Sequence, residues 1–253
     1  MLASPGDQEG GDDAFSADWP GRRATLAEEP MRGLRKLIRT AHKGGLNSQS
    51  VYSRWSNGMG AVYSGVEAFV SVKIAEQIHQ DLYDSQRLFV TLEYPTRAII
   101  ANAEIKFRGK KPRRLDDNGR IDVVVWDKYN YPIALIEVKR HLRWGSLKED
   151  ADRISLLLKR YGTQNGGSLV AGLIVVPFVT WQNASREKIH DHEASMADIE
   201  AEASRLGFSR EKEIYEEIAE EDPFKRSQDE NGELGYIHHM YGCMCLTLLP
   251  EDC

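Results

Sequence analysis

Three side chains near the middle of the chain have types and spacing that suit metal or phosphate chemistry. They stand in "GRIDVVVWDKYNYPIALIEVKR" (119–140), and they are Asp122, Glu137 and Lys139. Two apolar runs flank a short polar segment, which predicts a β-hairpin whose strands lie in a core. Charges at the outer ends of such a hairpin need partners, because burial destabilises a lone carboxylate.

The register of this hairpin decides which charges meet. A turn centred on residues 129–130 places Asp122 opposite Glu137, and Arg120 opposite Lys139. Facing residues have Cβ atoms about 4.5–5.5 Å apart, and alternation puts all four charged residues on one face. We expect that face to continue with Val124, Trp126, Ile133 and Leu135. We expect the other face to carry Ile121, Val123, Val125, Ala134, Ile136 and Val138.

Two ionised carboxylates at that distance repel each other and need a counter-charge. Lys139 and Arg120 would supply it in a structural ion-pair network. A divalent cation would supply it instead, bound by Asp122, Glu137 and the Val138 carbonyl, because Mg²⁺ prefers oxygen ligands. Lys139 would then act on a water or a phosphate. The residues alone leave both interpretations open.

Two helices are predicted before the hairpin. The segment 63–84 has apolar residues at three- and four-residue spacing, and Ser64 with Glu67 forms a capping-box pattern. The basic segment 31–45 reads as a shorter helix that ends at its Gly-Gly pair. Both are expected to pack on the domain that contains the hairpin.

The other elements follow from the same patterns. We expect a strand over 87–100 that is broken near its proline, an amphipathic helix over 146–162, and a strand over 168–179 buried on both faces. Acidic helices over 183–221 and a final strand over 235–249 complete the chain. The expected fold is α/β, a mixed β-sheet flanked by helices.

These residues resemble the motif of the PD-(D/E)XK nuclease superfamily, which has a restriction-endonuclease-like fold. Asp122 matches the acid of the first strand, and Glu137-Val138-Lys139 matches the (D/E)-X-K of the second. Ile121 stands where the motif's name has proline, which is a common departure. The predicted order from 63 to about 179, helix–strand–strand–strand–helix–strand, is similar to the core of that family.

The resemblance implies a metal-dependent nuclease that hydrolyses phosphodiester bonds. The activity it implies most directly is that of a DNA endonuclease in defence, restriction, recombination or transposition, with Mg²⁺ as cofactor and Mn²⁺ as its substitute. The implied catalytic residues are Asp122, Glu137, Lys139 and Glu67. The implied metal ligands are Asp122, Glu137, Val138 and Glu67. Lys139 would orient or activate the attacking water, or stabilise charge on the phosphate.

The third acid is a choice among glutamates. Glu67, on the first turn of its helix, resembles the helical acid of resolvase-like members of the family, and we prefer it to Glu76 or Glu93. Its competing interpretation is the capping box described above.

Charge is distributed unevenly along the chain. The net charge is −6, but residues 106–120 hold seven Lys/Arg and two Asp, and residues 186–233 hold sixteen acids and seven bases. A basic segment beside the motif suits a nucleic-acid backbone, with a solvated surface as the alternative. The candidate contacts are Lys110, Lys111, Arg113, Arg114, Arg120, Arg140 and Arg143. The expected partners are nucleic acid, DNA above all, and a second copy or another protein.

The domain organisation follows from composition. We expect an extension over 1–30, an N-terminal embellishment over 31–62, the nuclease core over 63–182, and acidic helices with a final strand over 183–253. No apolar run is long enough to span a membrane. All three cysteines lie in the last eleven residues, so we expect a reducing cytoplasm.

Other functions are less well supported. The run "HHMYGCMC" (238–245) is too cramped for a tetrahedral zinc site. No P-loop and no nucleophile-elbow motif occurs. Two alternatives to the nuclease stay open: a catalytically inactive nucleic-acid-binding or assembly module on the same fold, and an unrelated domain with a salt-bridged hairpin.

Overall fold

The computed structural model describes residues 29–55, 67–103, 119–140, 144–182, 189–210, 216–228 and 234–250. The helices are α1 (Glu29–Trp55), α2 (Glu67–Gln86), α3 (Thr96–Asn102), α4 (Trp144–Tyr161) and α5 (Ile189–Ser204). The strands are β1 (Phe89–Pro95), β2 (Arg120–Trp126), β3 (Pro132–Val138), β4 (Ala171–Gln182), β5 (Ser209–Arg210), β6 (Glu216–Gln228) and β7 (Leu234–Leu248).

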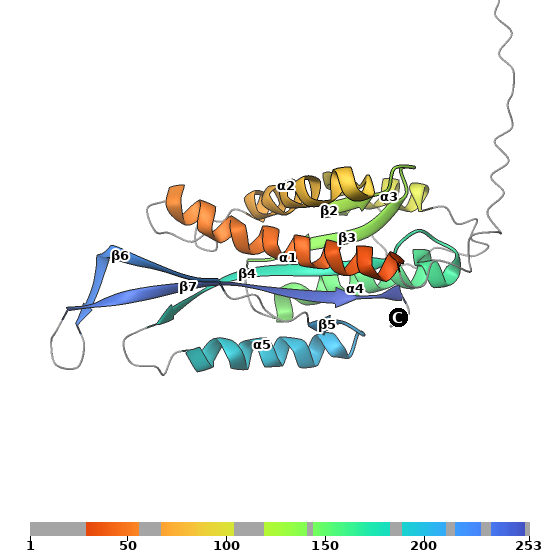
Figure 1. Ribbon diagram of the computed structural model, residues 1–253. Coiled ribbons are helices and arrows are strands. Elements are labelled where there is room, and N and C mark those ends of the chain that lie inside the picture. The colour runs from red at the N-terminus through yellow and green to blue at the C-terminus, as the bar shows by residue number, and fades with distance from the viewer. Residues whose placement is uncertain are drawn as a thin grey trace, which may run out of the picture.

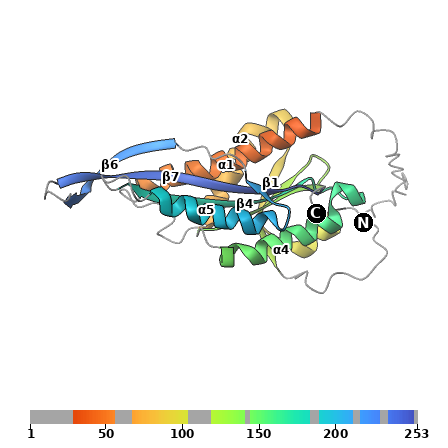
Figure 2. The same cartoon turned by 90° about the horizontal axis from the view of Figure 1, so that it is seen from below.

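These strands form one mixed sheet. The order is β1-β2-β3-β4-β7-β5, and β6 pairs with β7. β1, β2 and β3 are antiparallel neighbours, whereas β3 and β4 are parallel and are joined through α4. In both views, β6 and its part of β7 extend beyond the helices as an arm (Figures 1 and 2). The predicted α/β class, a mixed sheet flanked by helices, is confirmed.

Helices cover both faces of the sheet (Figure 1). On one face, α1 and α2 pack on a buried cluster that includes Val123, Val125, Ala134, Ile136, Val138, Leu173 and Val175. On the other face, α4 and α5 pack on a cluster that includes Val124, Trp126, Leu135, Ile174, Val176 and Phe178. Alternate residues of β4 thus enter opposite clusters, so the prediction of a strand buried on both faces is confirmed.

The β2–β3 hairpin has the predicted register over its central pairs. Val123 pairs with Ile136, Val124 with Leu135, and Val125 with Ala134. The register shifts at the turn side, where Trp126 pairs with Pro132 and Ile133 is the extra residue of a β-bulge. The prediction that Ile133 shares a face with Trp126 is therefore wrong, because Ile133 packs against the α1–α2 cluster.

Ile121 also departs from simple alternation. It lies in the α4–α5 cluster rather than with Val123. It pairs with Tyr94 beside Glu93, where the β1–β2 ladder skips a pair. Glu93 has a positive φ of 50°, so the backbone of β1 turns out of the regular pleat there.

The predicted end of the first helix is wrong for a packing reason. α1 does not end at Gly44 and Gly45 but runs on to Trp55. A Cβ on Gly44 would lie 2.7 Å from Ile74 Cα, and one on Gly45 would lie 2.7 Å from Cys243 Sγ. The two glycines therefore allow close approach of α1 to α2 and to the sheet, which compensates for their low helix propensity.

Two other segments have a different secondary structure from the one expected. Residues after Pro95 form the short helix α3 instead of continuing the strand. Residues 216–221, predicted as helix, belong to strand β6, which pairs with β7. Pairing along a long neighbouring strand satisfies the backbone of this acidic segment, and tertiary context of this kind overrides helix propensity.

Candidate functional site

The charged end of the hairpin lies where β3 ends and β2 begins. β3 is parallel to β4, and α4 begins soon after β3. In open α/β sheets, ligands bind beyond the carboxyl ends of parallel strands. Backbone bonds fix the position of this end, since the Lys139 N–H donates to the Val175 carbonyl at 2.9 Å.

Asp122 is held by the backbone of the neighbouring strand. The Val138 N–H donates to Asp122 Oδ2 at 2.7 Å. The ladder of paired residues ends at Val123 and Ile136, and beyond it the Asp122 and Glu137 side chains share a hydrogen bond, so the two acids meet as the sequence predicted. Val138 thus contributes its amide N–H to the site, and its carbonyl as a metal ligand stays a prediction.

Glu137 is almost fully buried, with 1% of its surface exposed. Its Oε1 lies 2.5 Å from Nη2 of Arg153 on α4. This is a charge-assisted bond, and removing one member of a buried pair typically costs about 3–5 kcal/mol. The sequence analysis did not name Arg153.

Asp150 is a second residue of α4 that the sequence analysis missed. Its Oδ1 accepts from Arg153 Nη2 at 2.6 Å, and its Oδ2 lies 2.8 Å from Lys139 Nζ. One carboxylate therefore joins the two cations of the site. A signal was present in the sequence, because Asp150 falls between Leu147 and Ile154 in the apolar stripe of the helix, where a charge needs a buried partner.

Burial shifts the pKa values of both hairpin acids upward. Burial raises the pKa of Glu137 well above its ordinary value of 4.5; Arg153 opposes this, and Asp122 adds to it. Burial also raises the pKa of Asp122 above 3.8, against the Val138 N–H, the Glu137 side chain and the charge of Lys139. Two carboxyl groups can hydrogen-bond to each other only when one carries a proton. Without a metal ion, the pair therefore keeps a proton at pH values above those at which isolated carboxyl groups lose theirs.

The two cations favour their charged forms. Burial lowers the pKa of Lys139, but the hydrogen bond and charge of Asp150, together with the charges of Glu67 and Glu137, outweigh burial, so the pKa rises above 10.5. Burial likewise lowers the pKa of Arg153, and Glu137 and Asp150 more than offset it. Lys139 is therefore an ammonium group that donates hydrogen bonds, which does not suit a general base.

Glu67, the preferred third acid, lies at the start of α2. Its Oε1 is 3.6 Å from Nε of Arg140, and its charge raises the pKa of Asp122. Glu67 is thus electrostatically coupled to the hairpin acids. Ser64, its expected capping partner, lies outside the described residues.

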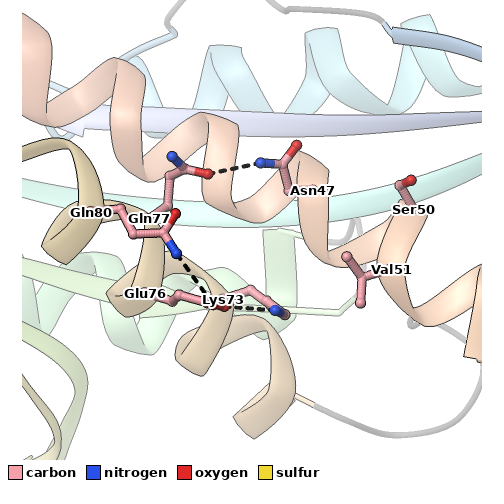
Figure 3. A pocket seen from close by; sticks show the side chains of 7 residues that line it. All are labelled: Asn47, Ser50, Val51, Lys73, Glu76, Gln77 and Gln80. Carbon is pink, nitrogen blue, oxygen red and sulfur yellow. Dashed lines mark hydrogen bonds and ion pairs between the residues drawn. The ribbon is translucent and has the colours of Figure 1, made fainter.

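Glu76 and Glu93, the alternatives, have other surroundings. Glu76 lines a pocket of about 220 Å³ between α1 and α2, where Lys73 binds its carboxylate at 2.6 Å (Figure 3). In the same pocket the Asn47 amide donates to Gln77 at 2.8 Å, so these polar groups are directed at each other (Figure 3). Glu93 is exposed, and its carbonyl accepts from Arg120 Nη1 at 3.4 Å.

The predicted nucleic-acid contacts are covered only in part. Arg120 is exposed and Arg140 is half-buried beside Glu67. The others, Lys110, Lys111, Arg113, Arg114 and Arg143, lie outside the described residues. In the terminal segment Cys243 and Cys245 are buried and not in a disulfide, and the side chains of its histidines are not among those described.

The donor set fits a hydrated hard cation. Among the described residues, no group of three or more His, Cys, Asp or Glu side chains is arranged to hold a metal ion. Mg²⁺, however, commonly uses one or two protein carboxylates together with waters and substrate phosphate. Asp122 and Glu137 meet that requirement chemically, because a divalent cation would replace their shared proton as the counter-charge.

Comparisons with known proteins do not indicate a function for the chain. No family model, curated protein or solved structure matches the chain. No helix in the described ranges combines the length and apolar character needed to cross a membrane.

Proposed function

We propose that this protein is a metal-dependent nuclease of the PD-(D/E)XK type, with the core α2–β1–β2–β3–α4–β4. The observation that supports the proposal most directly is the contact of Asp122 with β3, where its carboxylate accepts from the Val138 N–H and hydrogen-bonds with the Glu137 side chain, with Lys139 two residues further on. The reaction would be hydrolysis of a phosphodiester bond in DNA, and the biological setting would be defence, restriction, recombination or transposition. We place it in the cytoplasm, in keeping with Cys243 and Cys245, which are buried in the sheet and not in a disulfide.

In this proposal Asp122, Glu137 and Glu67 hold the cation, Mg²⁺ or Mn²⁺. The bound ion would polarise the scissile phosphate and lower the pKa of a coordinated water. Lys139, kept charged by Asp150, would donate hydrogen bonds to the phosphate or to the water. Arg140 and the basic segment 106–120 would neutralise the nucleic-acid backbone.

A cleavage assay tests the proposal. The protein is incubated with plasmid, linear and branched DNA, with Mg²⁺, Mn²⁺ or EDTA. We expect cation-dependent cleavage that falls by about 10²–10³-fold in Asp122→Asn and in Lys139→Ala. Asp198→Asn on the exposed side of α5 is the matched control and should cut as the wild type does. Cleavage that survives equally in all three variants would rule out this site.

One observation favours an inactive nucleic-acid-binding module as a second candidate. Arg153 already binds Glu137, and Lys139 already binds Asp150, so one hairpin acid and the proposed catalytic lysine have protein partners without a cation. DNA binding by fluorescence anisotropy, without cleavage under any metal condition, would favour this candidate. An absence of Asp122-dependent Mn²⁺ binding in calorimetry would favour a purely structural hairpin.

A further inference from the structure

One nitrogen of Arg153 bridges two carboxylates. Nη2 lies 2.5 Å from Glu137 Oε1 and 2.6 Å from Asp150 Oδ1. Arginine usually binds a carboxylate through two parallel N–H bonds. Here Nε is buried, and within the described part of the molecule it has no hydrogen-bond partner. The guanidinium is therefore incompletely satisfied in its present position.

The position of Arg153 conflicts with cation binding. Its charge lies against Glu137, which the proposed function makes a metal ligand. Two positive charges on one carboxylate oxygen repel strongly at low dielectric. Asp150 already holds the same nitrogen, so Arg153 can leave Glu137 and keep its second carboxylate. Asp150 also lies one helical turn from Arg153, so a side-chain rotation on α4 suffices.

We propose that Arg153 is a displaceable internal counter-charge that binds Glu137 when the site has no metal and moves to Asp150 alone when a divalent cation binds. The inference rests on the proposed function, because it needs the Asp122–Glu137 pair as a cation site. Its consequence is regulatory. The arginine competes with the cation, and it thereby sets the cation concentration at which the site loads.

Calorimetric titration of Mn²⁺ into the metal-free full chain tests the competition. Arg153→Gln should bind Mn²⁺ about tenfold more tightly than the wild type, because the competing state is gone. Lys139→Gln removes the same charge from the same network, but its Nζ bonds Asp150 at 2.8 Å. The gain in Mn²⁺ affinity of Lys139→Gln should therefore be clearly smaller than that of Arg153→Gln. Asp150→Asn should weaken Mn²⁺ binding, because Arg153 then has no second carboxylate.

Each outcome decides the matter. An equal gain in Mn²⁺ affinity in Arg153→Gln and Lys139→Gln would mean a general charge effect and would overturn the displacement of Arg153. Unchanged or weaker Mn²⁺ binding in Arg153→Gln would also overturn it. If neither the wild type nor Arg153→Gln binds Mn²⁺, the inference and the metal site both fail. Asp122-dependent binding without DNA cleavage would remove the nuclease and leave the role of Arg153 intact.

A structure of the wild-type protein with Mn²⁺ provides a second test, which needs no variant and so does not depend on whether a variant folds. We expect Arg153 Nη2 within hydrogen-bond distance of Asp150 and away from Glu137. An Mn²⁺ ion bound by Asp122 and Glu137 while Arg153 Nη2 stays on Glu137 Oε1 would overturn the inference.

Discussion

The backbone N–H of Val138 donates a 2.7 Å hydrogen bond to Oδ2 of Asp122. The peptide that follows Glu137 on β3 therefore holds a carboxylate that also hydrogen-bonds with the Glu137 side chain. This bond ties Asp122 of β2 to β3, and both strands lie in the interior of the sheet.

Stability without metal should fall as the pH rises. The folded pKa of Glu137 lies well above 4.5 because of burial, so the native state binds a proton that the unfolded state has released. That stabilisation is complete below about pH 4.5 and is lost as the pH passes through the folded pKa. Glu137→Gln removes the titration. The free energy of unfolding of the wild type should therefore decline relative to Glu137→Gln, with a slope of at most about 1.4 kcal/mol per pH unit.

Urea denaturation of both proteins in EDTA, at pH values from 4 to 8, measures this difference. A wild type that gains stability over Glu137→Gln as the pH rises would show that the folded pKa is depressed instead. Mn²⁺ should flatten the slope, because a bound cation replaces the proton.

Asp150→Asn should lower the pKa of Lys139. The bond between Asp150 Oδ2 and Lys139 Nζ is the main reason that the pKa of this lysine is raised despite its burial. Without it, burial dominates and favours the neutral amine. A pH titration of the lysine ¹³Cε signal by NMR measures the change directly. In a cleavage assay, the alkaline limb of the pH–rate profile should move to lower pH, because the reaction uses the charged form.

Asp150→Glu is the control for the lysine experiment, since it keeps the charge. An unchanged titration of Lys139 in Asp150→Asn would mean that another group holds the ammonium.

Glu67 and Glu76 form a matched pair for the third acid, because both lie on α2. Glu67→Gln should weaken Mn²⁺ binding by about tenfold, because its charge is coupled to Asp122. Glu76→Gln should change the affinity less than twofold, because Lys73 binds that carboxylate in the pocket beside α1. Calorimetry decides, and an equal loss in the two variants would exclude Glu67 as the specific third acid.

Gly172→Ala should destabilise the contact of α4 with the sheet. A Cβ on this residue of β4 would lie 2.1 Å from Ile154 Cγ2 and 3.0 Å from Leu158 Cδ1. Ile154 is fully buried and stiff, so overpacking should cost about 1–3 kcal/mol. Gly145→Ala on α4 is the control: its Cβ would meet no atom within 4 Å, and it should gain up to about 1 kcal/mol. Urea denaturation compares the two variants, and equal stabilities would contradict the packing described here.

Local pattern was enough to predict the hairpin. Alternation of apolar residues located β2 and β3, and the central register follows from a symmetric turn. The amphipathic helix over 146–162 was also predicted, and the apolar residues of its stripe are buried: Leu147, Ala151, Ile154, Leu157, Leu158 and Tyr161. The predicted faces failed at two residues. At Ile133 a one-residue bulge changed the face, and Ile121 lies in the α4–α5 cluster instead of with Val123. No periodic pattern carries that information.

The amino-acid sequence by itself determined which strands are buried and that Asp122 and Glu137 meet, because strand periodicity and hairpin register depend on neighbouring residues. Only the tertiary structure decided what neutralises them. Asp150 and Arg153 reach the hairpin from a helix that crosses over to the parallel strand β4, and that contact depends on how α4 packs. The length of α1 was also decided by tertiary packing. Contacts with α2 and β7 stabilise this helix at Gly44 and Gly45, where the local sequence predicts its end.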